Sequence, residues 1–443
     1  MTNSGDGKAE ALHGISAVIS NEERLLTTRA ASSARMSVRA RKALAGGANS
    51  NWQMTQPQAI WASRAAGSKV VDVDGNEYVD MHGRDVMLVG HAHPRIVEAV
   101  QERITQGSFV AQPTEDAIVV AEELQRRFQL PLWRFSNSGT EATMDAVHLM
   151  RAWTGRDHIV KVDGAYHGHH DSVMVDIDYA LDTVGIPAQM LALTHVIPFN
   201  DLEALECVFA AHRGEIAGII LEPVMLNAGV IPPDENYLQG VVDLAHGDGA
   251  LVAFDEVKSG FTIGPGGASG HFGVRPDILC LGKALGGGLP CGAVGGSEVV
   301  MELIASGKYQ QVGTFNGNPL TMAASRAAVC EILDARAYQI VARLREDLVK
   351  EIGEVIRRLG VVAHIVAIGA KGAIFFSPSP VRTFRDYQAI DSRTGHCHWL
   401  FQANRGVLLP PEGKSWLLSV QHTAEDMKQF AANFEEFAHA LGY

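Results

Sequence analysis

Five short runs of almost uninterrupted apolar residues alternate with helical patterns in the middle of the chain. The runs are LWRFS (132–136), HIVKV (158–162), AGIILE (217–222), GALVAFDE (249–256) and DILCLG (277–282). Strands that are apolar throughout are covered on both faces, as in parallel sheets flanked by helices. Because strands and helices alternate along the chain, the sequence predicts an α/β fold with a mostly parallel central sheet.

The regions on either side of these runs have other patterns, and they set the predicted domain limits. Residues 1–65 have helical character without a strand pattern, so we expect a helical N-terminal segment that packs as an arm. A hairpin turn at Asp74 opens the predicted large domain, residues 66–335. The rest of the chain, residues 336–443, begins with a long charged helical stretch and is predicted to form a smaller α+β domain.

The composition limits the kinds of partner that the protein is expected to bind. The formal net charge of −13 disfavours nucleic acid and anionic membranes, and it favours small molecules. The chain has no run of about eighteen apolar residues, and its N-terminus is polar and contains acidic residues. We therefore expect a soluble, cytoplasmic protein. The five cysteines are odd in number and widely spaced, which indicates free thiols rather than disulfides or a zinc ribbon.

The stretch LCLGKALGGGLP (279–290) places Lys283 directly after an apolar strand and ahead of consecutive glycines. Glycines let a ligand approach the backbone closely, and a desolvated lysine can form a Schiff base. The alternative is a solvated lysine in a glycine-rich surface loop. The sequence around Lys283 does not decide between these two interpretations by itself.

Asp255 ends the apolar run that precedes the Lys283 strand. The carboxyl ends of parallel strands share one edge of the sheet, where open α/β sheets bind ligands. A buried aspartate needs a partner, and the ring nitrogen of pyridoxal phosphate is one such partner. A helix N-cap or an ion pair would also account for Asp255. The combination of Asp255 with Lys283 favours a cofactor site.

The stretch SNSGTEATMDAVHLMR (136–151) joins a predicted strand to an amphipathic helix. Ser138, Gly139 and Thr140 lie at that junction, where free backbone N–H groups and two hydroxyls can hold a phosphate. Simple helix capping by Ser or Thr ahead of Glu141 is the alternative. These residues are therefore candidate phosphate ligands.

Two further stretches contain candidate cofactor ligands. DGAYHGHHDS (163–172) contains Tyr166, an aromatic residue that can stack on a planar ring, followed by His167. VGTFNGNPLTMAAS (312–325) contains Thr314, a hydroxyl residue in a Gly/Asn-rich turn ahead of a helix. We include Tyr166, His167 and Thr314 among the candidate cofactor-binding residues.

Taken together, these stretches resemble the class III, fold-type I, pyridoxal-phosphate-dependent aminotransferases, and most closely their glutamate-1-semialdehyde aminomutase branch. The resemblance runs from about residue 45 to the C-terminus, and the motifs keep the family's order and spacing. The motifs are GHAHP (90–94), NSGTEA (137–142), AYHGHHDS (165–172), EPV (222–224), FDEVKSGF (254–261), LGKALGGGLPCGA (281–293) and GTFNGNPLTMAA (313–324). Each motif alone is a weak signal, whereas the whole set is specific.

The resemblance implies pyridoxal phosphate as the cofactor and a fold-type I architecture with a large and a small domain. Lys283 would bind the cofactor covalently and later move a proton between substrate and cofactor, and Asp255 would keep the ring nitrogen protonated. A homodimer with shared active sites is implied as well, because Thr314 would reach the phosphate of the other subunit. The remaining implied cofactor contacts are Ser138, Gly139, Thr140, Tyr166, His167, Glu222 and Val257.

The sequence departs from the family on the substrate side. An arginine that the family carries after an Asn-Ser pair is missing from GGANSNWQM, which offers Asn51 and Trp52 instead, and the loop before GHAHP lacks the usual Ser-Trp-Gly-Pro. Arg84 and Lys414 are candidate replacements for the carboxylate anchor, although an arginine or lysine near a turn is more often solvated. Lys258 stands where relatives often have methionine, a departure to which we assign no consequence.

Two histidine clusters were considered as metal sites. His167, His169, His170 and Asp171 lie close together in sequence, but the resemblance accounts for AYHGHHDS without a metal. The same interpretation applies to His396 and His398 around Cys397. We therefore expect no metal ion.

The predicted function is an aminotransferase that moves an amino group from an amine or a β- or ω-amino acid to an oxo-acid acceptor, through pyridoxamine phosphate. An isomerase of the glutamate-1-semialdehyde 2,1-aminomutase type is the first alternative, and a pyridoxal-phosphate-dependent decarboxylase is the second. A scaffold or sensor without enzymatic activity is disfavoured by the intact Lys283 and Asp255. The expected partners are small-molecule substrates and a second copy of the chain.

Overall fold

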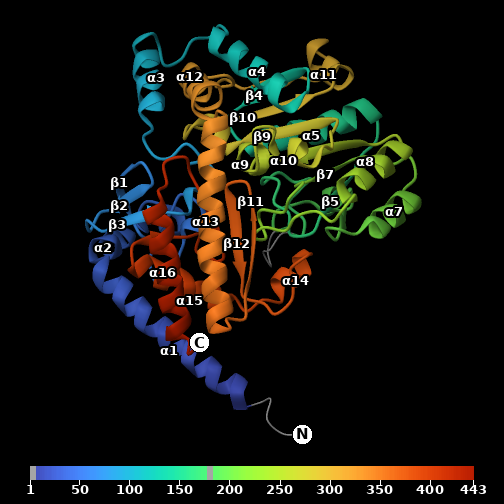
Figure 1. The fold of residues 1–443 in the computed structure, drawn as a ribbon. Helices are drawn as coiled ribbons and strands as arrows, with labels where there is room; N and C mark the ends of the chain where they lie inside the picture. Colours follow the sequence, from blue (N-terminus) through green and yellow to red (C-terminus); the bar gives the residue numbers. More distant parts are fainter. Residues whose placement is uncertain (1–5, 177–182) are drawn as a thin grey trace.

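The structure is a computed structural model that describes residues 6–176 and 183–443. Its central element is a seven-stranded sheet with the order β4-β10-β9-β8-β7-β5-β6 (Figure 1). The strands are β4 (Leu132–Ser136), β5 (His158–Val162), β6 (Thr194–Ile197), β7 (Ile216–Leu221), β8 (Leu251–Asp255), β9 (Ile278–Gly282) and β10 (Gly292–Gly296). Neighbouring strands from β6 to β9 are parallel, and β10 is antiparallel to both of its neighbours. The predicted α/β fold with a mostly parallel sheet is confirmed.

Both faces of the sheet are covered, which explains the apolar runs. Ile219 of β7 belongs to a buried cluster with α7 (Leu202–Ala211) and α8 (Tyr237–Gly247). The next residue, Ile220, belongs to a separate cluster with α5 (Gly139–Thr154). Because successive strand residues point to opposite faces, each face needs its own apolar residues.

Strand β10 was not predicted, because its sequence is GAVGG. The glycines are required by close packing rather than by strand propensity. A Cβ on Gly292 would lie 2.2 Å from the carbonyl oxygen of Ser138, and one on Gly295 would lie 2.6 Å from the Trp133 ring. Strand β10 can therefore pair with β4 only if Gly292 and Gly295 have no side chains.

Two smaller sheets lie beside the central sheet. One contains β1 (Ala62–Ala66), β2 (Lys69–Asp72), β3 (Glu77–Asp80) and β13 (Val407–Leu408), and the other contains β11 (His364–Ile368), β12 (Lys371–Phe375) and β14 (Ser415–Leu417). The predicted hairpin at Asp74 joins β2 to β3. Because β13 pairs with β3 across the predicted domain limit at residue 335, the division of the chain into domains stays a prediction.

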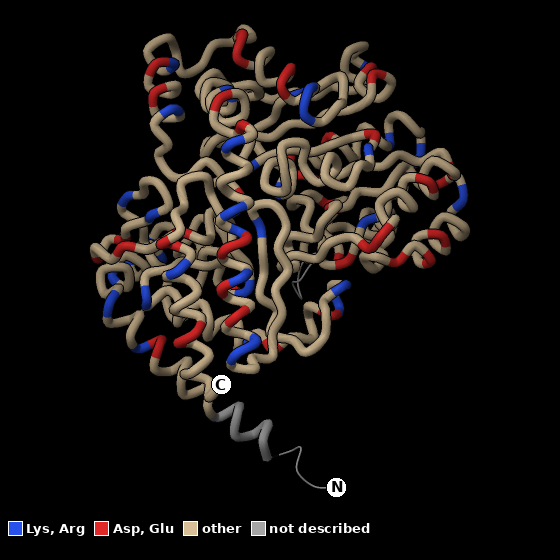
Figure 2. The backbone as a smooth tube through the Cα atoms, in the orientation of Figure 1, with Lys and Arg blue, Asp and Glu red and all other residues tan. Residues whose placement is uncertain are grey.

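The remaining helices surround these sheets. The longest is α13 (Ala335–Leu359), which begins at the Asp334 N-cap and packs against α16 (Ala424–Ala440). The shorter ones are α3 (Pro94–Thr105), α4 (Glu115–Phe128), α6 (Ala188–Leu191), α9 (Ser259–Thr262), α10 (Gly267–Phe272), α11 (Glu298–Ala305), α12 (Pro319–Arg326) and α14 (Phe384–Gln388). No helix within the two described ranges is long and apolar enough to cross a membrane. Acidic and basic residues are interspersed along the chain rather than separated by sign (Figure 2).

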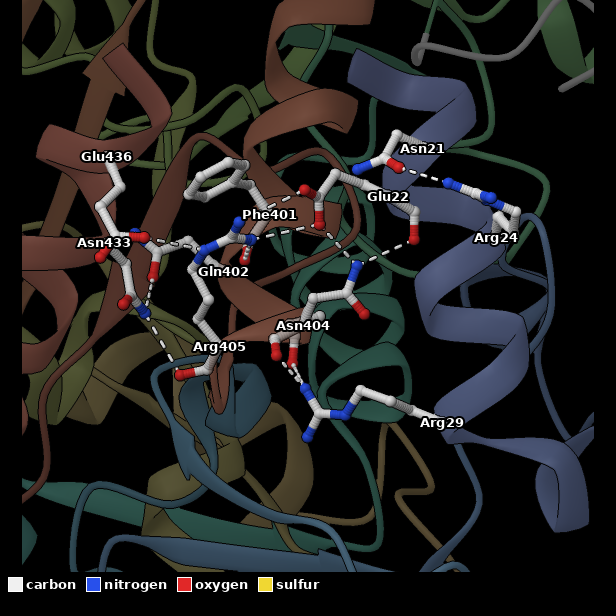
Figure 3. Close-up of polar contacts among 11 residues, drawn as sticks. Asn21, Glu22, Arg24, Arg29, Phe401, Gln402, Asn404, Arg405, Asn433 and Glu436 are labelled. Carbon is white, nitrogen blue, oxygen red and sulfur yellow. Dashed lines mark hydrogen bonds and ion pairs between the residues drawn. The ribbon is translucent and has the colours of Figure 1, made fainter. Parts of the chain in front are cut away.

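The N-terminal segment forms α1 (Asp6–Arg29) and α2 (Ala31–Ala40), and α1 lies against α15 (Ser392–Asn404) near the other end of the chain. The buried carboxylate of Glu22 accepts a hydrogen bond of 2.7 Å from Asn404 and pairs with Arg405 at 3.2 Å (Figure 3). Arg29 donates to the backbone oxygen of Asn404. The helical arm is thus fastened to the C-terminal region of its own chain.

Candidate active site

Lys283 and Asp255 lie at the carboxyl edge of the central sheet. Asp255 is the last residue of β8, and Lys283 directly follows β9, the neighbouring parallel strand. Lys283 adopts a left-handed conformation with φ of 50°, which is uncommon for a residue with a side chain. Such backbone strain costs roughly 1–2 kcal/mol and clusters at functional sites. The short helix that follows, η4 (Lys283–Gly286), fixes the lysine at this edge.

The environment of Lys283 lowers the pKa of its amine. Burial lowers the pKa of Lys283 to about 8, and the nearby ammonium of Lys258 lowers it as well. The carboxylates of Asp85 and Asp255 act in the opposite direction but do not cancel the effect of burial. A lysine with a lowered pKa holds more of the unprotonated amine at neutral pH, and that form attacks a carbonyl carbon.

Asp255 is buried, and both of its carboxylate oxygens have partners. Oδ1 accepts a hydrogen bond of 3.0 Å from the Val257 backbone N–H, and Oδ2 lies 2.8 Å from His167 Nδ1. The other ring nitrogen of His167, Nε2, is also buried, and no residue in the described part of the chain bonds it. A buried polar atom of this kind is usually paired, so the environment of His167 fits a bound polar ligand.

The start of α5 provides an anion site at the same edge. Ser138 is the N-cap of α5, and its side chain accepts a hydrogen bond of 3.2 Å from the Glu141 backbone N–H, so the capping alternative holds for this hydroxyl. The first N–H groups of a helix lack partners within the helix, and here they belong to Gly139 and Thr140. A Cβ on Gly139 would lie 2.7 Å from the Val257 side chain. The glycine is therefore required where the helix start meets the sheet edge.

Val257 and Glu222 lie beside Lys283 and the start of α5, and the backbone of Tyr166 is connected to Glu222 through Asn227. The Val257 side chain contacts the position of Gly139 and also that of Gly282, which precedes Lys283. Asn227 donates hydrogen bonds to the backbone oxygen of Tyr166 at 3.3 Å and to Glu222 Oε1 at 2.8 Å. Burial raises the pKa of Glu222. The helix start, the buried lysine and the buried aspartate together suit a phosphorylated aldehyde, and stacking of Tyr166 on its ring remains a prediction.

Thr314 lies on an exposed loop. Its neighbours Val312 and Phe315 are 82% and 58% exposed, which is high for apolar side chains. The same loop approaches the phosphate cradle through a hydrogen bond of 3.1 Å from Asn137 to Asn316. A contact between Thr314 and the site of a second subunit remains a prediction.

Sequence reasoning missed a buried ionic cluster beside Lys283. Asp85 is paired with the ammonium groups of Lys371 and Lys258, the latter at 3.5 Å. Burial acts to raise the pKa of Asp85, but Lys371, Lys258 and Lys283 together hold it well below its usual value. Lys258 also donates a hydrogen bond of 2.9 Å to the backbone oxygen of Leu226. This cluster explains the departure at Lys258.

Two signals in the sequence could have revealed the cluster. Asp85 follows Arg84 in a loop whose usual Ser-Trp-Gly-Pro is uncharged, and Lys371 begins the otherwise uncharged strand KGAIF. A lysine in a buried strand is rare unless it is paired. Neither signal reveals the ion pair by itself, because residues 85 and 371 come together only in the folded chain.

The tentative substrate residues fall into two places. The Arg84 guanidinium lies 4.5 Å from the centroid of the Trp52 ring, a cation–π contact. Asn51 is exposed beside Trp52 in η2 (Asn51–Gln53), while the loop of Arg84, η3 (Gly83–Asp85), lies against η4, which begins with Lys283. Lys414 is buried, and its ammonium lies 4.3 Å from the centroid of the Tyr387 ring.

The histidines that were considered as metal ligands take part in hydrogen bonds. His169 Nδ1 lies 3.4 Å from the Thr140 hydroxyl, and His170 Nε2 lies 3.5 Å from that of Thr143. Burial lowers the pKa of His170 to about 4, so this ring is neutral at pH 7. His398 Nδ1 lies 2.7 Å from the backbone oxygen of Gly413.

The chain was compared with known proteins. The family model for class III aminotransferases matches residues 51–441. A glutamate-1-semialdehyde 2,1-aminomutase 2 of Exiguobacterium sibiricum is 38% identical over 386 residues, which cover 85% of this chain and 88% of the relative.

Solved structures give the same result. A glutamate-1-semialdehyde aminomutase from Pseudomonas aeruginosa PAO1 has a TM-score of 0.90 at 29% identity, covering 97% of this chain and 99% of that one. An omega-transaminase from Sphaerobacter thermophilus has a TM-score of 0.87 at 33% identity, covering 92% and 97%. Another structure of the Pseudomonas enzyme is a complex with PMP, the amino form of the cofactor. The chain therefore belongs to the class III aminotransferases, enzymes with the fold-type I architecture that use pyridoxal phosphate.

Proposed function

We propose that the chain catalyses transamination, from an amine or a β- or ω-amino acid donor to an oxo-acid acceptor. When bound, pyridoxal phosphate supplies an electron sink for the charge that develops on the substrate carbon. The proposal is supported by the ionic cluster of Asp85, Lys258 and Lys371 beside Lys283, because Lys258 and the loop of Asp85 are two places where the sequence departs from the aminomutase branch. A pocket built differently beside an unchanged catalytic lysine indicates a different substrate.

On the cofactor side, each residue has a separate task. With pyridoxal phosphate bound, Lys283 would hold it through Nζ and would then take up and return the substrate proton, and its lowered pKa would suit both tasks. Asp255 presents a negative charge to the ring nitrogen, while His167 fixes the orientation of that carboxylate. The start of α5 would bind the phosphate through its backbone N–H groups.

On the substrate side, the charges favour an anion. Asp85 offsets one of the two ammonium groups that it contacts, so the three charged groups of this cluster together carry one positive charge. Arg84 adds a further positive charge from the same loop. An oxo-acid acceptor carries a carboxylate, so we assign Arg84 as its anchor, held in place by Trp52.

The test is the absorbance of the bound cofactor during reaction with a panel of donors and no acceptor. We expect one donor class to bleach the aldehyde absorbance, and an added oxo acid to restore it. Evolution of carbon dioxide instead would favour the decarboxylase. In Arg84→Ala, the KM for the oxo acid is expected to rise about tenfold or more with little change for an uncharged amine. Arg64→Ala, at an exposed position in β1, is the matched control.

The aminomutase reaction is the second candidate function, favoured by the sequence identity to the Exiguobacterium enzyme. Such an enzyme needs no separate acceptor, because the amino group moves within one molecule. Steady turnover of glutamate-1-semialdehyde without an added oxo acid would establish this activity and overturn the proposal. A transaminase should instead convert one molecule of substrate per bound cofactor and then stop, and it should resume when an oxo acid is added.

A further inference from the structure

We propose that His158, His195 and His212 form a binding site for a divalent transition metal, with zinc as its first candidate. One ring nitrogen from each histidine lies within 4.8 Å of the other two. The site is at the amino-terminal edge of the central sheet, because His158 is the first residue of β5 and His195 the second residue of β6. It is thus at the opposite edge from Lys283 and Asp255.

The strand register brings two of the rings together. In the parallel pair β5–β6, Val160 lies opposite His195, and residues opposite each other point to the same face. His158 precedes Val160 by two residues, so its side chain points to that face as well. The resulting distance from His158 Nδ1 to His195 Nε2 is 2.9 Å.

The third ring comes from the helix that covers the same face. His212 is the C-cap residue of α7, and its ring centroid lies 4.1 Å from that of His195 and 5.5 Å from that of His158. All three histidines are half-buried, so a metal ion can reach them from solvent. Three ligands from three separate elements match the histidine set of an open zinc site, in which water takes the fourth position.

The chemistry of the rings also suits a metal. His212 Nδ1 lies 3.1 Å from the Glu215 carboxylate, which leaves its Nε2 for the ion. Histidine ligands commonly donate their second N–H to a carboxylate in this way. Imidazole ligands select zinc, nickel or copper over magnesium and calcium.

A hydrogen-bonded stack without metal is the competing explanation. It accounts for the contact of His158 with His195 and for the packing of the His212 ring against both. Only metal binding makes the stability of the fold depend on zinc, which is what the zinc-binding experiment measures. Zinc–nitrogen bonds of about 2.0–2.1 Å would put two ligands of a tetrahedral site about 3.3 Å apart. The observed 2.9 Å therefore needs to open by only a few tenths of an ångström.

The position of the site indicates what a bound ion would do. The chain between His158 and His195 contains Tyr166 and His167. A metal bound by both histidines would hold the two ends of this stretch together. Strand β6 lies at the edge of the sheet, where pairing on one side alone holds it. An ion that binds only the folded state stabilises it by mass action. We expect this ion to be structural, because it is far from the reacting groups.

The test is zinc binding to the full-length enzyme loaded with its cofactor, after chelator treatment and gel filtration. Calorimetry should show one tight zinc ion per chain, and the melting temperature should rise with added zinc. His195→Ala and His212→Ala should weaken binding by more than about tenfold and abolish the rise. His439→Ala, which removes an exposed histidine elsewhere, should behave like wild type.

Cobalt substitution gives an independent readout. Cobalt bound by three imidazoles and water in a tetrahedral site absorbs strongly in the visible range, whereas loosely bound surface cobalt does not. Circular dichroism and cofactor absorbance report whether each variant is folded and loaded. The proposal would be overturned if wild type bound zinc no better than a folded His195→Ala variant. It would also be overturned if His439→Ala lost as much zinc affinity as His195→Ala. Either result is independent of the reaction that the enzyme catalyses.

Discussion

The lowered pKa of Lys283 has a consequence for stability. In the cofactor-free chain, burial lowers the pKa to about 8, while an unfolded lysine keeps its ordinary value of 10.5. Between these values the unfolded state binds more protons, so the free energy of unfolding should rise with pH across this window. Below about pH 8 the burial penalty is present in full.

Lys283→Met should remove this pH dependence. We expect the cofactor-free variant to be more stable than cofactor-free wild type near pH 7 and to lose that advantage near pH 10. Urea unfolding at both pH values measures the difference. Lys308→Met, at an exposed position, is the control and should follow wild type. A constant difference between Lys283→Met and wild type across this range would show that Lys283 is not perturbed.

At Asp85, the prediction concerns an unpaired charge. Asp85→Asn leaves the buried ammonium of Lys371 and the half-buried ammonium of Lys258 without their carboxylate, and it should destabilise the fold by about 3–5 kcal/mol. The double variant Asp85→Leu with Lys371→Met removes both charges of the closest pair and should recover part of that loss. Urea midpoints of the single and double variants test this. Equal stability of Asp85→Asn and wild type would contradict the buried ionic cluster.

Among the elements, β10 depends most on the absence of side chains. A Cβ on Gly292 would collide with the Ser138 carbonyl, which belongs to the residue that caps α5. Gly292→Ala should therefore displace the start of α5 and weaken cofactor binding, by an expected tenfold or more for about 1.4 kcal/mol lost. Gly247→Ala, with open space around the added Cβ, is the matched control. Unchanged cofactor affinity in Gly292→Ala would show that β10 does not position the cradle.

The elements also show what the sequence could predict. Four of the five predicted strands, β5, β7, β8 and β9, are almost entirely buried, and burial on both faces leaves such a continuous apolar run. Strand β4 lies at the edge of the sheet and has exposed residues. Strand β10 was missed since its glycines follow from contacts with Trp133 and Ser138, which are distant in sequence. The short strand β13 depends on pairing with β3, and no local pattern specifies that.

In the active site, too, some residues could be predicted from the sequence and others could not. Lys283, Asp255 and the start of α5 could be found because each lies at a strand end or helix start with a recognisable sequence. The roles of Asp85 and Lys371 could not be found, because the pair exists only after two remote segments pack together. Substrate recognition is built from such remote contacts, and this is why the donor was predicted only as a class.

For the whole molecule, the open question is whether two chains share each site. If Thr314 reaches the partner's phosphate, a hybrid dimer of a Lys283→Ala chain and a Thr314→Ala chain contains one intact site. Separately tagged chains allow the hybrid to be purified. We expect its cofactor affinity and activity per intact site to match wild type. A hybrid no better than the Thr314→Ala homodimer would place Thr314 in its own chain's site or in neither.

The most direct measurement is to identify the lysine that holds the cofactor. Borohydride reduction of the yellow enzyme fixes the cofactor on its lysine, and peptide mass mapping then locates it. The account predicts the label on Lys283, whose amine has the lowered pKa and lies at the sheet edge with Asp255. Label on the neighbouring Lys258 or Lys371, or no label on a protein saturated with pyridoxal phosphate, would contradict the proposed site.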